Sequence, residues 1–143
     1  MIKLKSLLRE KYNAAVDDYF YHMTLSTNIQ NIKAHGLRTR RVNMTCTDWE
    51  DSKGKIFLCD LGAVKTWIIF IADWGIRVHN VPDIGIFRVK KKKTPPVHFD
   101  RSGTIDSGYD VYYVVKDIPP ESLEFVKSVS REEIIQFEKD YDD

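Results

Sequence analysis

The sequence predicts an α+β fold, and three observations lead to this prediction. Apolar residues recur at roughly helical spacing early in the chain, β-prone runs dominate its second half, and the late strands are arranged like hairpin pairs. The 143 residues are 43% hydrophobic and 30% charged, an ordinary globular balance for a single domain spanning 1–143.

The first part of the chain alternates a helix, a strand and a helix. Apolar residues at roughly helical spacing predict an amphipathic helix over residues 1–16. The aromatic-rich segment Tyr19–Thr24 predicts a strand. A short helix follows, which we expect Ser26 or Thr27 to cap at its start and Gly36 to end.

The middle of the chain opens with a polar loop over residues 38–54. A short strand is expected over Lys55–Cys59, followed by a helix from Asp60 to about Trp74. The β-prone segment Ile84–Val89 alternates poorly between apolar and polar residues. Because a strand covered on both faces lacks that alternation, this pattern predicts a buried strand.

The last third begins with a glycine- and serine-containing loop over residues 100–109. Val111–Val115 is the strongest strand signal in the chain, and Pro119-Pro120 predicts a turn. Leu123–Val129 is a further predicted strand. The segment Ser130–Glu133 has the form of a capping box, which predicts the start of a terminal helix.

Several classes of protein are excluded by composition. The longest apolar run, Trp67–Trp74, is far shorter than the ~20 residues that cross a bilayer, so no membrane association is expected. The N-terminus intersperses charges among its apolar residues, unlike a secretory signal. Cys46 and Cys59 are interpreted as reduced thiols of a cytoplasmic protein, and no metal site is expected. The net charge of +1 restricts any nucleic-acid contact to local patches.

Three segments, in this order, resemble the ADP-ribosyltransferase superfamily. Tyr19–Thr24, Asn28–Ile32 and His35–Leu37 resemble the family's Tyr-His-x-Thr, Asn-Leu-x-x-Ile and Gly-Leu motifs. Gly54–Trp67 is similar to its strand-helix unit, and Asp110–Leu123 resembles its strand followed by Val/Ile-Pro-Pro-Glu-x-Ile. The first motif resembles that of DNA-targeting toxins in particular. The resemblance implies a split β-sandwich with flanking helices and NAD as the substrate.

Enzymes of the His-Tyr-Glu type within this family supply three site positions, and His22 matches the first. The resemblance implies that His22 binds a ribose hydroxyl, for which an imidazole suits because it donates and accepts at once. The alternative is a strand histidine bonded to the backbone. Met23 replaces a frequent glycine, so its side chain would have to turn to the other face of the strand. Thr24 either contacts the ligand or is an ordinary strand residue.

Phe57 matches the second position, a tyrosine that stacks on nicotinamide; phenylalanine keeps the π-face and loses the hydroxyl. Trp67 is a candidate for a further aromatic wall. For both residues the alternative is core packing. Asp110 best matches the third position, a catalytic glutamate that stabilises an oxocarbenium-like ribose. The register also permits Tyr112 near this position, and a solvated turn carboxylate is the alternative for Asp110.

The expected function is therefore NAD-dependent mono-ADP-ribosyl transfer to a protein or nucleic acid, with His22, Phe57 and Asp110 as catalytic candidates. Size and resemblance suggest a phage or bacterial defence, counter-defence or toxin factor. Arg38, Arg40, Arg41 and Lys90–Lys93 are candidates for phosphate contacts, or are solvated loop charges. Two alternatives stay open: a non-catalytic binding protein of this fold, and an enzyme similar to RNA 2′-phosphotransferases.

Overall fold

A computed structural model describes residues 17–39, 54–81, 83–101 and 110–142. The helix predicted over residues 1–16 lies outside the described residues. So do most of the two predicted loops and Cys46.

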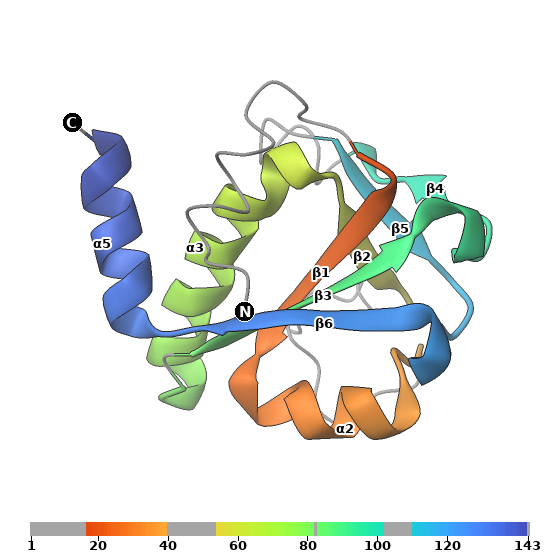
Figure 1. Ribbon diagram of the computed structural model, residues 1–143, viewed down its shortest axis with the longest axis horizontal. Coiled ribbons are helices and arrows are strands. Elements are labelled where there is room, and N and C mark those ends of the chain that lie inside the picture. Colours follow the sequence, from red (N-terminus) through yellow and green to blue (C-terminus); the bar gives the residue numbers. More distant parts are fainter. Residues whose placement is uncertain (1–16, 40–53, 82, 102–109, 143) are drawn as a thin grey trace.

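The described strands form one six-stranded sheet in the order β4-β5-β2-β1-β3-β6 (Figure 1). All neighbouring strands run antiparallel. The strands are β1 (Tyr19–Leu25), β2 (Ile56–Cys59), β3 (Ile84–Lys90), β4 (His98–Phe99), β5 (Val111–Val114) and β6 (Leu123–Val129).

Helices cover both faces of this sheet. Figure 1 shows α3 (Val64–Trp74) and α5 (Arg131–Asp142) together on one side, with α2 (Ile29–His35) below the strands. A π-helical turn over Gly75–His79 continues α3. None of the helices in the described ranges is long and apolar enough to cross a membrane. The molecule is thus α+β, as the sequence predicts.

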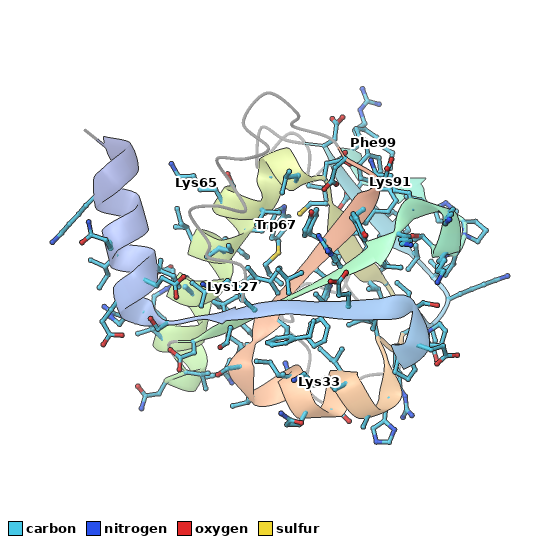
Figure 2. All side chains as sticks on the ribbon, in the orientation of Figure 1. Lys33, Lys65, Trp67, Lys91, Phe99 and Lys127 are labelled. Atoms are coloured by element: carbon cyan, nitrogen blue, oxygen red, sulfur yellow. The ribbon has the colours of Figure 1, made fainter. Side chains whose placement is uncertain are left out.

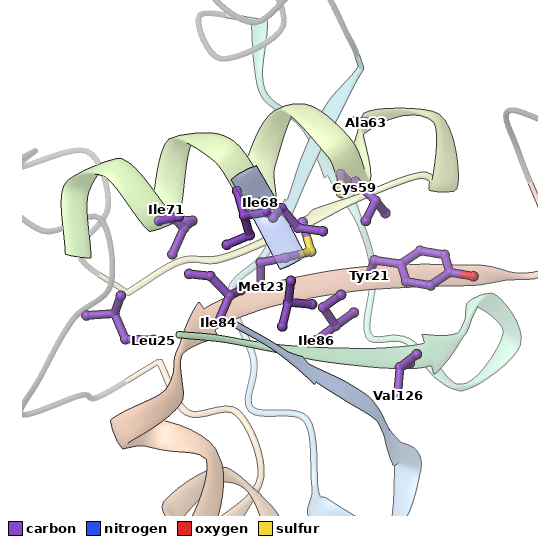
Figure 3. Packing of buried hydrophobic residues seen from close by; sticks show 14 of the residues in the cluster. Tyr21, Met23, Leu25, Cys59, Ala63, Ile68, Ile71, Ile84, Ile86 and Val126 are labelled. Carbon is purple, nitrogen blue, oxygen red and sulfur yellow. The ribbon is translucent and has the colours of Figure 1, made fainter. Parts of the chain in front are cut away.

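The core beneath α3 is built from alternate residues of the central strands. Tyr21, Met23 and Leu25 of β1 point toward α3, where they meet Ile68 and Ile71 (Figure 3). Successive side chains of a strand point to opposite faces. Phe20, His22 and Thr24 of β1 therefore point to the opposite face of the sheet.

The second core lies beneath α2. Phe20 of β1 and Phe87 of β3 pack here against Ile29 and Ile32 of the helix. The close approach of α2 depends on Gly85, because a Cβ at this position would stand 2.6 Å from Cγ1 of Ile29. A larger residue at Gly85 would require the Ile29 side chain, or α2 with it, to move away from the sheet.

Most predicted elements match the structure within two residues at their ends. β6 has the predicted bounds, and β1 and β5 each differ by one residue. The expected helix from Asp60 begins as a 3-10 turn at Leu61, with the α-helix starting at Val64. Strand β4 was not predicted, because two residues are too few to show alternation.

The late strands that the sequence predicts do not form hairpin pairs with one another, and the late hairpin that does form includes β4, which was not predicted. β4 pairs with β5, but β5 and β6 lie on opposite sides of β2-β1-β3. The caps expected from Ser26 or Thr27 were wrong, since no side-chain cap bond forms at Leu25 or Asn28. Asn28 Nδ2 instead donates to Thr24 Oγ1 at 3.0 Å.

The terminal helix begins with one half of the predicted capping box. The amide of Glu133 donates to Ser130 Oγ at 3.2 Å, as the motif predicts. The Glu133 carboxylate does not complete the box but pairs with the ammonium of Lys127 on β6. Because the Lys127 side chain is only 6% exposed, this pair joins α5 to the sheet.

The sheet is nearly divided between β1 and β2. β1 pairs with β3 over its whole length, from Tyr19↔Lys90 to Leu25↔Ile84. Within the described residues, β1 meets β2 through one register pair, Tyr21↔Cys59. The sheet thus consists of two three-stranded halves, β4-β5-β2 and β1-β3-β6, which diverge after Tyr21.

Candidate functional site

His22 bridges the two halves where they diverge. Its Nδ1 lies 2.9 Å from the carbonyl oxygen of Phe57 in β2. Because a carbonyl can only accept, Nδ1 carries a proton and donates; in the neutral form of the ring, Nε2 is then the acceptor nitrogen. The His22 side chain is only 6% exposed. The alternative considered for His22, a strand histidine that is hydrogen-bonded to the backbone, matches this geometry.

Met23 and Thr24 lie on opposite faces of β1. The side chain of Met23 is buried in the core beneath α3, so it does turn away from the face that carries His22. Thr24 is buried and accepts the hydrogen bond from Asn28 at the start of α2. Its methyl group lies 3.6 Å from where a Cβ of Gly85 would stand. The position of Thr24 therefore fits a structural role in which it helps to hold α2 against β1.

The two aromatic candidates, Phe57 and Trp67, lie toward the α3 face. The neighbours of Phe57 in β2 both belong to the α2 core, so alternation directs the Phe57 ring to the opposite face. There it packs edge-on against Tyr113, with ring centroids 6.3 Å apart. Trp67 lies on α3, partly buried against the core beneath that helix (Figure 2). Its ring packs edge-on against that of Phe70, with ring centroids 5.6 Å apart.

The indole nitrogen of Trp67 is a buried donor with no hydrogen-bond partner among the described residues. An unsatisfied buried donor costs about 1–3 kcal/mol, so such groups usually have a function or meet a solvent molecule. This atom distinguishes Trp67 from an ordinary core tryptophan.

Asp110 and Tyr112 lie together at the start of β5. The Tyr112 hydroxyl is 3.5 Å from Asp110 Oδ2, and Asp110 is exposed. The Tyr112 ring packs between Phe20 at 5.4 Å and Phe99 at 5.9 Å. Leu58 of β2 pairs with Tyr112, so Tyr112 lies two strands from β1 on the face that carries His22.

Asp60 and Lys91 also lie at this end of the sheet, and neither was predicted from the sequence as an individual site residue. Asp60 follows β2 directly, and Lys91 Nζ lies 2.7 Å from its Oδ1. Burial raises the pKa of Tyr112, and the nearby carboxylates of Asp60 and Asp110 raise it further. Tyr112 is thus a protonated donor between two acids. Asp60 could have been predicted as a site residue, because it is a polar residue directly after a strand. Lys91 appeared in the sequence only as one member of the run Lys90–Lys93.

The structure therefore divides the predicted set. It links His22 to the backbone of Phe57, and it brings Asp110 to Tyr112. It directs Met23 and Trp67 to the α3 core, away from the face of His22. In the portion of the chain that the structure describes, no cluster of three metal-ligating side chains occurs.

No protein-family model matches the chain, and no curated protein matches it. The geometry of these residues and the three motifs therefore carry the functional argument.

Proposed function

We propose that this chain is an NAD-dependent ADP-ribosyltransferase that modifies a macromolecule, with its NAD site at the divergence of β1 and β2. The observation that carries the proposal is the hydrogen bond from His22 to the carbonyl of Phe57. It joins the two motif segments that resemble the family's first and second positions. A sheet divided into two halves also fits the split architecture that the resemblance implies.

The residues around the divergence fit a dinucleotide in chemistry. The Nδ1–H bond fixes the ring of His22, and an imidazole held in this way suits contact with a ribose hydroxyl, because the ring can both donate and accept. On the α3 face, the indole N–H of Trp67, which has no hydrogen-bond partner among the described residues, is a donor of the kind that a ligand carbonyl or phosphate would satisfy. The proposed NAD site therefore draws on side chains from both faces of the sheet at the point where β1 and β2 separate.

Asp110 provides the negative charge that transfer needs. Breaking the bond between nicotinamide and ribose develops positive charge on the ribose, which a carboxylate stabilises. Asp110 is one methylene shorter than the usual glutamate, and the neighbouring Tyr112 hydroxyl lies within 3.5 Å of it. We therefore assign charge stabilisation to Asp110 and hydrogen bonding to Tyr112.

Nicotinamide release from NAD, measured with and without a cell lysate as the source of acceptor, tests this proposal. We expect release, with ADP-ribose label entering protein or nucleic acid, and a loss of about 100-fold or more in Asp110→Asn. Glu132→Gln, the same chemical change at an exposed position of α5, is the matched control and should keep full activity. Release that is equal in Asp110→Asn and the wild type would contradict the assignment of Asp110.

A binding protein without transfer activity is the second candidate. It is favoured by the contact between Phe57 and Tyr113, which holds the Phe57 ring against its own sheet and away from a stacking partner. This candidate predicts that NAD raises the melting temperature while no nicotinamide is released under any condition. Removal of phosphate from a 2′-phosphorylated RNA would instead identify a phosphotransferase.

A further inference from the structure

A basic pocket lies at the end of β3, apart from the residues assigned to NAD. It has a volume of about 530 Å³ and is lined by Asp18, Tyr19, Lys90, Lys91 and Lys92. Pockets that hold small molecules usually measure roughly 300–1,000 Å³, so this one has the size for a small ligand.

The lysines project from a turn that the backbone fixes in place. The amide of Lys91 donates to the carbonyl of Asp18 at 2.9 Å, which ties the turn to the start of β1. Thr94 closes the other side, because its amide donates to Lys91 O and its hydroxyl to Lys90 O at 2.9 Å. Cations that are held by an ordered backbone lose less freedom when they bind a ligand.

Charge and chemistry at this pocket favour an anion. Its lining carries three lysine cations and one carboxylate, Asp18. Two further carboxylates lie nearby: Asp60, which pairs with Lys91, and Asp17, whose Oδ1 accepts a hydrogen bond from the Tyr19 amide. Lysine ammonium groups donate up to three hydrogen bonds and commonly bind phosphate oxygens. Tyr19 adds an aromatic wall, against which the Arg88 guanidinium packs at 4.1 Å from the ring centroid.

We propose that this pocket binds the phosphate group of a small phosphorylated ligand, with Lys90, Lys91 and Lys92 as the binding residues. Asp60 competes with the ligand for Lys91, since the two partners of that ion pair lie 2.7 Å apart. The pocket also adjoins the candidate site, because Lys91 Nζ is 5.0 Å from the ring of Phe20, which packs against Tyr112. The proposal does not rest on NAD as the substrate.

Calorimetric titration of the full chain with inorganic phosphate, AMP and adenosine at fixed low salt tests this inference. Phosphate and AMP should bind and adenosine should not. Lys90→Ala and Lys92→Ala should each weaken binding about threefold to fivefold, as expected for exposed ion pairs. Lys116→Ala removes the same charge from an exposed position beyond β5 and should leave binding unchanged.

Two further variants separate the causes. Asp60→Asn should tighten phosphate binding because it frees Lys91, an effect that a loss of folding would not produce. Asp110→Asn should lower transfer by about 100-fold or more and leave phosphate binding intact, which distinguishes failure of this inference from failure of the proposed function. Equal weakening by Lys116→Ala, equal binding of adenosine and AMP, or binding only of an oligonucleotide would each overturn the proposal.

Discussion

The imidazole of His22 donates a hydrogen bond from Nδ1 to the carbonyl oxygen of Phe57, at 2.9 Å, across the point where two half-sheets diverge. A ladder bond from the backbone of β1 would normally satisfy such a carbonyl. Here a side chain does so, and the same residue is the leading candidate for contact with NAD. The stability of the sheet and the proposed contact with NAD therefore depend on one side chain.

Replacing His22 should separate these two roles. His22→Leu keeps a comparable volume and leaves the Phe57 carbonyl without its donor, so we expect a loss of about 1–3 kcal/mol in the free energy of unfolding. His22→Asn keeps a donor near the position of Nδ1 and should lose less stability. Both variants should lose NAD binding, since neither has a ring nitrogen at Nε2. Urea denaturation and NAD-dependent thermal shifts provide the measurements, and equal stability of both variants would argue against the bond.

Gly36 ends α2 in a conformation that only glycine adopts easily, with φ of +77°. A Cβ there would stand 2.1 Å from the carbonyl oxygen of Ile118. Gly36→Ala should therefore destabilise the fold by about 2–4 kcal/mol through strain and overlap together. Gly54 has a φ of +72° with nothing within 4 Å of its Cβ position, so Gly54→Ala should cost only the backbone strain of about 1 kcal/mol. Similar chemical denaturation midpoints for the two variants would contradict this account.

The decrease in the free energy of unfolding at alkaline pH should depend on Cys59. Burial raises the pKa of the Cys59 thiol above its ordinary value of 9.0, with a smaller contribution from the charge of Asp60. The unfolded chain therefore releases this proton first, and the free energy of unfolding should fall as the pH rises above about 9. The Tyr21 hydroxyl acts in the same direction, because burial and the hydrogen bond to Asp17 raise its pKa above the ordinary value of 10.0.

Cys59→Ala should flatten the stability profile between pH 9 and 10 while Tyr21 still titrates above it. Urea denaturation at closely spaced pH values measures this slope. A variant whose stability falls as steeply as the wild type over that interval would show that the thiol does not contribute.

The ion pair between Lys127 and Glu133 should show strong coupling in a double-mutant cycle. Glu133→Gln leaves the buried ammonium of Lys127 without its counter-charge, and we expect a loss of about 1–3 kcal/mol, because Glu133 itself is 38% exposed. Lys127→Met in the same chain removes the buried charge and should restore part of that loss. If the two changes simply add, the pair does not hold α5 to the sheet.

Signals that are local along the chain were enough to predict most of the elements and to select the candidate site residues. Hydrophobic patterning located β1 and β6 to within a residue, and Gly36 marked the end of α2, because these signals depend on neighbours along the chain. The motif comparison singled out His22 and Asp110 before any geometry was known.

How these residues are placed relative to one another depends on packing between elements that are distant in the sequence. The order of strands separates β5 from β6 and puts Tyr112 two strands from β1, which no local pattern encodes. The pairing of Asp60 with Lys91 joins the end of β2 to the turn after β3, a contact made by side chains 31 positions apart. The separation of β1 from β2 after Tyr21 likewise depends on how the strands pack. Because of that separation, the side chain of His22 links the two strands through its hydrogen bond to Phe57.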